Sequence, residues 1–155
     1  MFHVVLYRPE IPSNTGNISR TCAVTGAVLH LIKPLGFSIS DRHLKRAGLD
    51  YWSLLDVRVH ESLEAFLDIH GGEKLWLVET SGGRRYDEVV YPEGSFFVFG
   101  QETKGMPEEF MRGRADSVVR IPMKECPQAR SLNLSNTVAV LLYEALRQGN
   151  FAGLG

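Results

Sequence analysis

The sequence has only two cysteines among its 155 residues, Cys22 and Cys126, and neither belongs to a CxxC pair. So few cysteines exclude a disulfide-stapled secreted scaffold, and we expect two free thiols in a reducing cytoplasm. No apolar run approaches the roughly 18 residues of a membrane span. The first ten residues also lack the basic start and the long apolar stretch of a signal peptide. The sequence therefore predicts a cytoplasmic protein with no membrane partner.

An excess of either charge is missing as well, because 17 basic and 18 acidic residues give a net charge of −1. The chain thus lacks the overall basic character of many nucleic-acid-binding domains. Its charges are unevenly distributed: residues 1–50 carry six Lys/Arg and three Asp/Glu, residues 51–110 five and twelve, and residues 111–155 six and three. If the two ends of the chain meet, they form a basic face that can attract phosphate locally. Scattered charges without a functional patch are an equally open alternative.

Several catalytic and ligand-binding motifs are absent. The histidines at 3, 30, 43, 60 and 70 match no HExxH or similar ligand spacing, so we expect no metal site. The sequence contains no GxxxxGK[ST] loop, no GxSxG elbow and no GxGxxG fingerprint. These absences argue against a zinc protease, a P-loop nucleotidase, an α/β-hydrolase and a Rossmann dinucleotide enzyme.

Short apolar runs and helical patterns alternate along the chain. The apolar runs predict strands at residues 2–7, 28–32, 57–60, 75–78, 96–99 and 118–121. Helical patterns lie at residues 13–25, closed by Gly26, at 40–47, at 61–69 and from 134 onward. The alternation predicts an α/β fold, a mostly parallel sheet flanked by helices in one domain over residues 1–155.

The last helix is apolar nearly all the way round. One face carries Val138, Leu141, Leu142, Ala145 and Leu146, and its flanks add Ala139, Val140 and Tyr143. Such a helix is typically buried on several sides. Its own domain is one possible cover, and a second subunit is the other.

Ligands of an open parallel sheet bind beyond the carboxyl ends of the strands. The first segment there, PEIPSNTGNISR at residues 9–20, offers N-cap candidates at 13–16, and a helix start of this kind favours an anion or a ribose phosphate. Asn14 supplies an amide, and Arg20 places a guanidinium about one turn further on. A well-capped helix with a solvated arginine is the alternative.

Two further segments follow predicted strands. GQETKGMP at residues 100–107 has two glycines that let the backbone approach a flat ligand, although a plain strand–helix connector fits equally well. Glu102 in this turn can accept hydrogen bonds from the backbone or from a ligand. Residues 121–136 lead through two prolines to a helix for which Ser131 or Asn133 is the expected cap. We expect Asn136, one turn into that helix, to bridge loops.

PEIPSNTGNISR, FGQETKGMP and IPM…RSLNLSNTVAVLLYEALRQ resemble, in order and spacing, the three motifs of the SPOUT (SpoU-type) RNA ribose methyltransferases. LIKPLGF and RHLKRAGLDYW are similar to the small branch that methylates the wobble nucleotide of tRNA. The resemblance implies a sheet whose C-terminal part is tied in a deep trefoil knot. It also implies a homodimer that transfers methyl from S-adenosylmethionine to the wobble cytidine or uridine in the tRNA anticodon loop. A ribose methyltransferase for another RNA, a non-catalytic RNA-binding dimer and a flavodoxin-like nucleotide enzyme are the alternatives.

The resemblance also implies roles for individual residues. The cofactor contacts carried over are Val78, Gly100, Gly105, Ile121, Met123, Ser131, Leu132 and Asn136. Arg20 corresponds to the arginine of the first motif, and we expect it to position the ribose or its phosphate because arginine is a poor base. Asn14 and Tyr143 are further catalytic candidates, although simple packing is the more common role of a helical tyrosine. The expected tRNA surface comprises Arg42, Lys45, Arg46 and Arg130 with Arg20.

Overall fold

The computed structural model describes the chain except for residues 41, 43, 45, 47 and 48. The described residues form a seven-stranded sheet in the order β3-β2-β1-β6-β4-β7-β5, and every pairing is parallel. The strands are β1 (His3–Tyr7), β2 (Val28–Ile32), β3 (Val57–His60), β4 (Leu75–Val78), β5 (Arg84–Arg85), β6 (Phe96–Phe99) and β7 (Val118–Arg120). The prediction of a mostly parallel α/β sheet is confirmed.

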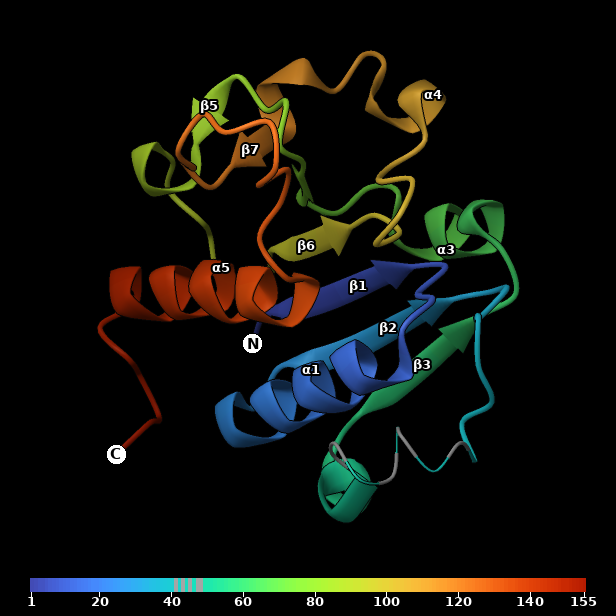
Figure 1. Cartoon of the computed structure of the whole chain (residues 1–155). Helices are drawn as coiled ribbons and strands as arrows, with labels where there is room; N and C mark the ends of the chain where they lie inside the picture. Colours follow the sequence, from blue (N-terminus) through green and yellow to red (C-terminus); the bar gives the residue numbers. More distant parts are fainter. Residues whose placement is uncertain (41, 43, 45, 47–48) are drawn as a thin grey trace.

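Helices cover both faces of this sheet. They are α1 (Pro12–Thr25), α3 (Leu63–His70), α4 (Glu108–Met111) and α5 (Leu134–Gln148), with 3-10 turns η1 (Leu49–Leu54), η2 (Tyr86–Glu88) and η3 (Ala115–Ser117). Figure 1 shows α1 (blue) and α5 (red) along the same face, so the first and last thirds of the chain meet there. Of the helix predicted at 40–47, residues 42, 44 and 46 are helical, and residues 41, 43, 45 and 47 lie outside the described residues. No helix in the described part of the chain is long and apolar enough to cross a bilayer.

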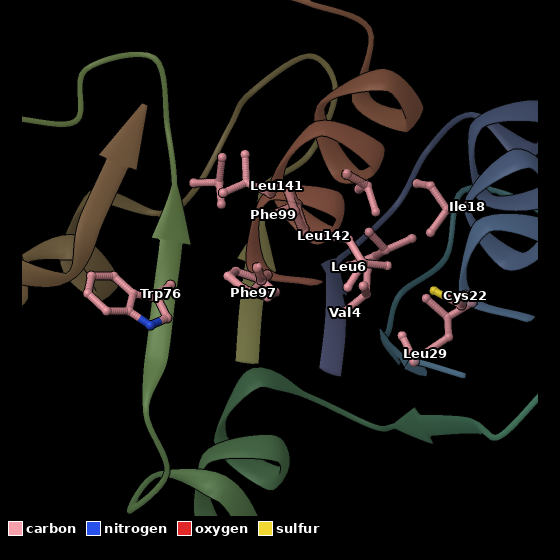
Figure 2. Close-up of a cluster of buried hydrophobic side chains, with 14 of the residues drawn as sticks. Val4, Leu6, Ile18, Cys22, Leu29, Trp76, Phe97, Phe99, Leu141 and Leu142 are labelled. Atoms are coloured by element: carbon pink, nitrogen blue, oxygen red, sulfur yellow. The ribbon is translucent and has the colours of Figure 1, made fainter. Parts of the chain in front are cut away.

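The core has two layers because neighbouring residues of a strand point to opposite faces of a sheet. On one face, Ile18 and Cys22 of α1 and Leu141 and Leu142 of α5 pack on alternate residues of the strands (Figure 2). On the other face, Phe66 of α3 and Phe110 of α4 cover the intervening ones, which include Val5, Ile32, Phe96 and Val98. The two helices with conspicuous motifs at their starts therefore share one face.

The helix ends differ in part from the predictions. Gly26 closes α1 in the left-handed conformation with φ 73°, as predicted. The N-cap prediction at residues 13–16 is wrong, because α1 begins at Pro12 and its N-cap is Ile11. The Ile11 side chain makes no capping hydrogen bond. Proline suits the first helical position because the helix leaves that N–H unpaired in any case. Asn133 caps α5, and its side chain accepts from the Ser135 and Asn136 N–H groups.

Candidate functional site

A cavity of about 430 Å³ lies at the carboxyl ends of β4, β6 and β7, between the turn at 100–105 and the loop that enters α5. This is the edge at which a parallel sheet binds its ligands. Seven of the eight predicted cofactor residues line the cavity: Val78, Gly100, Gly105, Ile121, Met123, Ser131 and Leu132. Segments that are distant in sequence thus converge on one site.

The eighth predicted residue, Asn136, has an exposed side chain and is not among the described residues that line the cavity. The bridging that we expected of Asn136 is performed by Asn133 instead. Its Nδ2 donates to the Oδ1 of buried Asn14 at 3.1 Å, while its Oδ1 caps α5. One amide therefore joins the starts of α1 and α5 beside the cavity, and sequence analysis had considered it only as a cap.

The turn at 100–105 is closed by two backbone hydrogen bonds between Gln101 and Gly105, at 3.1 and 2.9 Å. A Cβ on Gly100 would lie 2.2 Å from the carbonyl carbon of Gly105. Gly105 has φ +67°, and a Cβ there would lie 2.7 Å from Oε1 of Glu79. Both glycines are therefore required by the turn itself, in addition to any role towards a ligand.

Two carboxylates fix this turn. Glu79, directly after β4, accepts a hydrogen bond from the Met106 N–H. Glu102 accepts from the backbone N–H groups of Glu10 and Ile11, at 2.9 and 3.1 Å, so the expected bond to backbone is present. Glu102 thereby binds the N-cap residue of α1 from more than 90 positions away. We predicted no role for Glu79 from the sequence. The one feature that could have marked it is its place as an acidic residue directly after a buried strand.

The cavity combines apolar and charged surface. Met123 and Leu132 line it although their side chains are 40% and 39% exposed, and Phe99 adds an aromatic wall. Glu79, Glu102 and Arg130 supply charge at the lining. Such a site can hold a ligand with a flat apolar part and polar or charged groups.

The predicted catalytic residues are spread more widely. Asn14 lines the cavity and is 5% exposed. Arg20 lies on the exposed side of α1, where its Nη2 donates to the Tyr51 hydroxyl at 3.2 Å and its guanidinium stacks on that ring. Tyr143 is 45% exposed on α5. Neither Arg20 nor Tyr143 is among the described residues that line the cavity of this chain.

The predicted RNA-binding residues have exposed side chains where the structure describes them. Arg42, Arg46 and Arg130 are exposed, and Arg130 also lines the cavity. Lys45 lies outside the described residues. Tyr51, which holds Arg20, was missed because η1 has no motif that marks a partner for an arginine on another helix.

Residues 1–143 match the SpoU rRNA Methylase family. This chain belongs to that family. It is 53% identical to a tRNA (cytidine(34)-2'-O)-methyltransferase of Methylovorus glucosotrophus strain SIP3-4, over 99% of each chain. A solved structure described as giving insights into the 2-OH methylation of C/U34 on tRNA is 45% identical over 97% of each chain, with a TM-score of 0.90. An AdoMet-bound rRNA methyltransferase from Sinorhizobium meliloti is 26% identical, with a TM-score of 0.82 over 94% of this chain and 56% of that one. SpoU membership confirms the resemblance carried by the three motifs.

Proposed function

We propose that this chain is a tRNA ribose 2′-O-methyltransferase that takes methyl from S-adenosylmethionine and modifies the wobble cytidine or uridine. The cavity carries the proposal, because it gathers seven predicted cofactor residues at the carboxyl edge of the sheet. Similarity over the full length to a tRNA (cytidine(34)-2'-O)-methyltransferase supports the substrate.

The residues present fit this cofactor. The volume of about 430 Å³ falls in the range of small-molecule and cofactor sites. Val78, Ile121 and Leu132 offer apolar surface to a purine, and the carboxylates of Glu79 and Glu102 put negative charge beside a sulfonium cation. When bound, S-adenosylmethionine supplies an electrophilic methyl group.

The protein's own contribution is positioning. A ribose hydroxyl reacts when it is held about 3–3.5 Å from the carbon it attacks. Arg130 at the cavity can hold a phosphate of the substrate, and Asn14 is fixed by Asn133 at the same edge. Arg20 remains cationic at neutral pH, so we assign it to the ribose or the adjacent phosphate and not to proton removal.

A homodimer formed through α1 and α5 gives Arg20 a role in the reaction at the cavity of the partner subunit. Large apolar side chains stay exposed on and beside these helices: Val24 at 54%, Tyr143 at 45% and Phe151 at 41%. A second subunit would cover them, and it would place Arg20 and Tyr143 of one subunit near the cavity of the other. Arg42, Lys45 and Arg46 then extend the tRNA surface. The trefoil knot, the single-domain organisation and the cytoplasmic location remain predictions.

Labelled S-adenosylmethionine and total tRNA test the proposal. We expect label in 2′-O-methylcytidine or 2′-O-methyluridine at position 34 after nuclease digestion and mapping of the product. Label at another position, or in ribosomal RNA only, would identify a ribose methyltransferase with a different target. Cofactor and tRNA binding without transfer would instead indicate a non-catalytic RNA-binding protein.

A further inference from the structure

Four histidines meet on the face of the sheet opposite α1 and α5. His3 comes from β1, His30 from β2, His60 from β3 and His70 from the last position of α3. The ring centroid of His30 lies 5.2 Å from those of His3 and His60 and 5.1 Å from that of His70. The absence of a ligand spacing in the sequence predicted no metal site, but each member of this histidine cluster belongs to a different element, so spacing along the chain could not reveal it.

Hydrogen bonds order the rings. Nδ1 of His3 and Nε2 of His30 are 3.0 Å apart, as are Nδ1 of His30 and Nε2 of His60. A neutral imidazole has one donor and one acceptor nitrogen. When His30 donates its Nε2–H to His3, its Nδ1 carries a lone pair directed towards His60.

Burial keeps these imidazoles neutral. His30 is fully buried, which lowers its pKa to about 3, and burial also lowers the pKa of His3, His60 and His70 below their ordinary values. Neutral imidazole is the form that binds metal ions. The geometry agrees, because ring nitrogens of neighbouring histidines face one another at 3.0 Å.

We propose that His30, His60 and His70 bind one divalent transition-metal ion of the zinc class, with His3 as the residue that orients His30. One ring nitrogen from each of the three lies within 4.8 Å of the other two. Nitrogen ligands of a tetrahedral zinc ion, bound at about 2.0–2.1 Å, are about 3.3–3.4 Å apart. The His30–His60 pair opens by a few tenths of an ångström to reach this spacing, and His70 moves inward.

His70 can make this movement. It ends α3, two glycines follow it, and its side chain is only half-buried. The partly exposed ring also provides a path for the ion, and solvent can fill a fourth coordination position. The proton that lies between Nδ1 of His30 and Nε2 of His60 moves to Nδ1 of His60, so all three ligands stay neutral. Imidazole ligands without thiolate suit zinc, copper and nickel.

The surrounding charges permit a cation. Arg58 and, near His3, the N-terminal ammonium are nearby positive groups, and Asp56 accepts two hydrogen bonds from the Arg58 guanidinium, at 3.2 and 2.8 Å. Glu73 provides negative charge near His3 and His70. The site lies across the sheet from the cavity, so an ion here would join α3 to β2 and β3 without touching the reaction. The proposal is independent of the proposed function.

Titration of chelator-treated, full-length protein with zinc chloride tests the site. We expect one ion per chain by calorimetry and, with cobalt chloride, the d–d absorption of a tetrahedral Co²⁺ ion. Zinc at about 100 times its Kd should raise the melting temperature by on the order of 5–10 °C. A wild-type protein that binds neither ion and gains no thermal stability would overturn the proposal.

Variants separate this site from adventitious binding. His70→Gln removes a ligand at a helix end, so it should fold normally without metal and weaken zinc binding by more than the roughly 10–100-fold that loss of an orienting partner costs. His3→Gln should fall within that range, and methyl transfer should be unchanged in His70→Gln. Cys126→Ser is the matched control and should bind zinc like the wild type. Equal zinc binding in the wild type, His70→Gln and His60→Gln, or its loss in Cys126→Ser, would assign the ion to another place and refute the proposal.

Discussion

The two faces of the sheet satisfy their polar groups in different ways. On the α1–α5 face, polar side chains join distant segments: Glu102 binds the backbone at the start of α1, and Asn133, which caps α5, binds the side chain of Asn14. On the α3–α4 face, the histidines bind one another. The first arrangement builds the walls of an open cavity, whereas the second runs from buried His30 and His60 to half-buried His3 and His70. Side chains that fix other parts of the chain can frame a site for a ligand. Histidines that are bonded only to one another can exchange those hydrogen bonds for bonds to a metal ion.

Arg20→Ala, on the α1–α5 face, should produce the largest effect, which is a loss of methyl transfer. Within the part of the chain that the structure describes, the guanidinium hydrogen-bonds to and stacks on Tyr51, and Arg20 does not line the cavity. We expect methyl transfer to fall roughly 10²–10³-fold, as when one charge-stabilising donor is removed, while S-adenosylmethionine binds normally in calorimetry. Arg112→Ala, an exposed arginine that follows α4, is the control and should retain activity. Loss of cofactor binding together with activity would contradict the assigned role.

Gly105→Val should affect both stability and cofactor affinity. The side chain would be held at φ +67° and would meet the carboxylate of Glu79, which together cost about 2–3 kcal/mol of folding free energy. Because the same turn lines the cavity, we expect cofactor affinity to fall as well. Gly83→Ala, where a Cβ meets no described atom within 4 Å, should change neither quantity. A Gly105→Val protein that melts early yet binds cofactor normally would remove the turn from the binding site.

The two thiols should differ in reactivity and in their response to pH. Burial raises the pKa of Cys22 to about 12, above its ordinary value of 9.0, whereas Cys126 is partly exposed. The neutral thiol of Cys22 therefore stabilises the folded state fully below pH 9, and this stabilisation is lost as pH rises towards 12. We expect about 1–2 kcal/mol of loss between pH 9 and 10.5 by chemical denaturation, and a smaller loss in Cys22→Ala. A thiol reagent at pH 8 should modify Cys126 in the native protein and Cys22 only after unfolding.

Glu102→Gln should have the smallest effect. The amide keeps one acceptor oxygen but loses the charge and one of two bonds to the start of α1, so we expect a loss of about 1 kcal/mol in thermal denaturation. Lys104→Gln, an exposed neighbour in the same turn, is the matched control. A melting temperature equal to that of the control would show that the link contributes nothing to stability.

The elements with strong local signals were predictable. All six predicted strands are present with bounds within a residue or so, because buried parallel strands are continuous apolar runs. β5 was missed because it consists of two exposed arginines, Arg84 and Arg85, whose pairing with β7 is decided by tertiary context.

Contacts between distant segments were not predictable from residue spacing. The start of α1 was misplaced because its N-cap N–H is satisfied by Glu102 from another segment. Most of the cavity lining was found through motifs that are continuous in sequence. The histidine cluster and the Arg20–Tyr51 contact each join side chains from separate elements, and no motif marks them.

The double hydrogen bond from Glu102 to the start of α1 has a thermodynamic consequence. The same turn lines the cavity and is hydrogen-bonded to the start of the helix that carries Arg20, so a bound cofactor that shifts this turn would also shift the start of α1. Linkage then requires reciprocity: whatever factor bound cofactor contributes to tRNA affinity, bound tRNA contributes to cofactor affinity. A glutamate that moves with both ligands would couple them, and the order in which they bind would not alter the strength of that coupling.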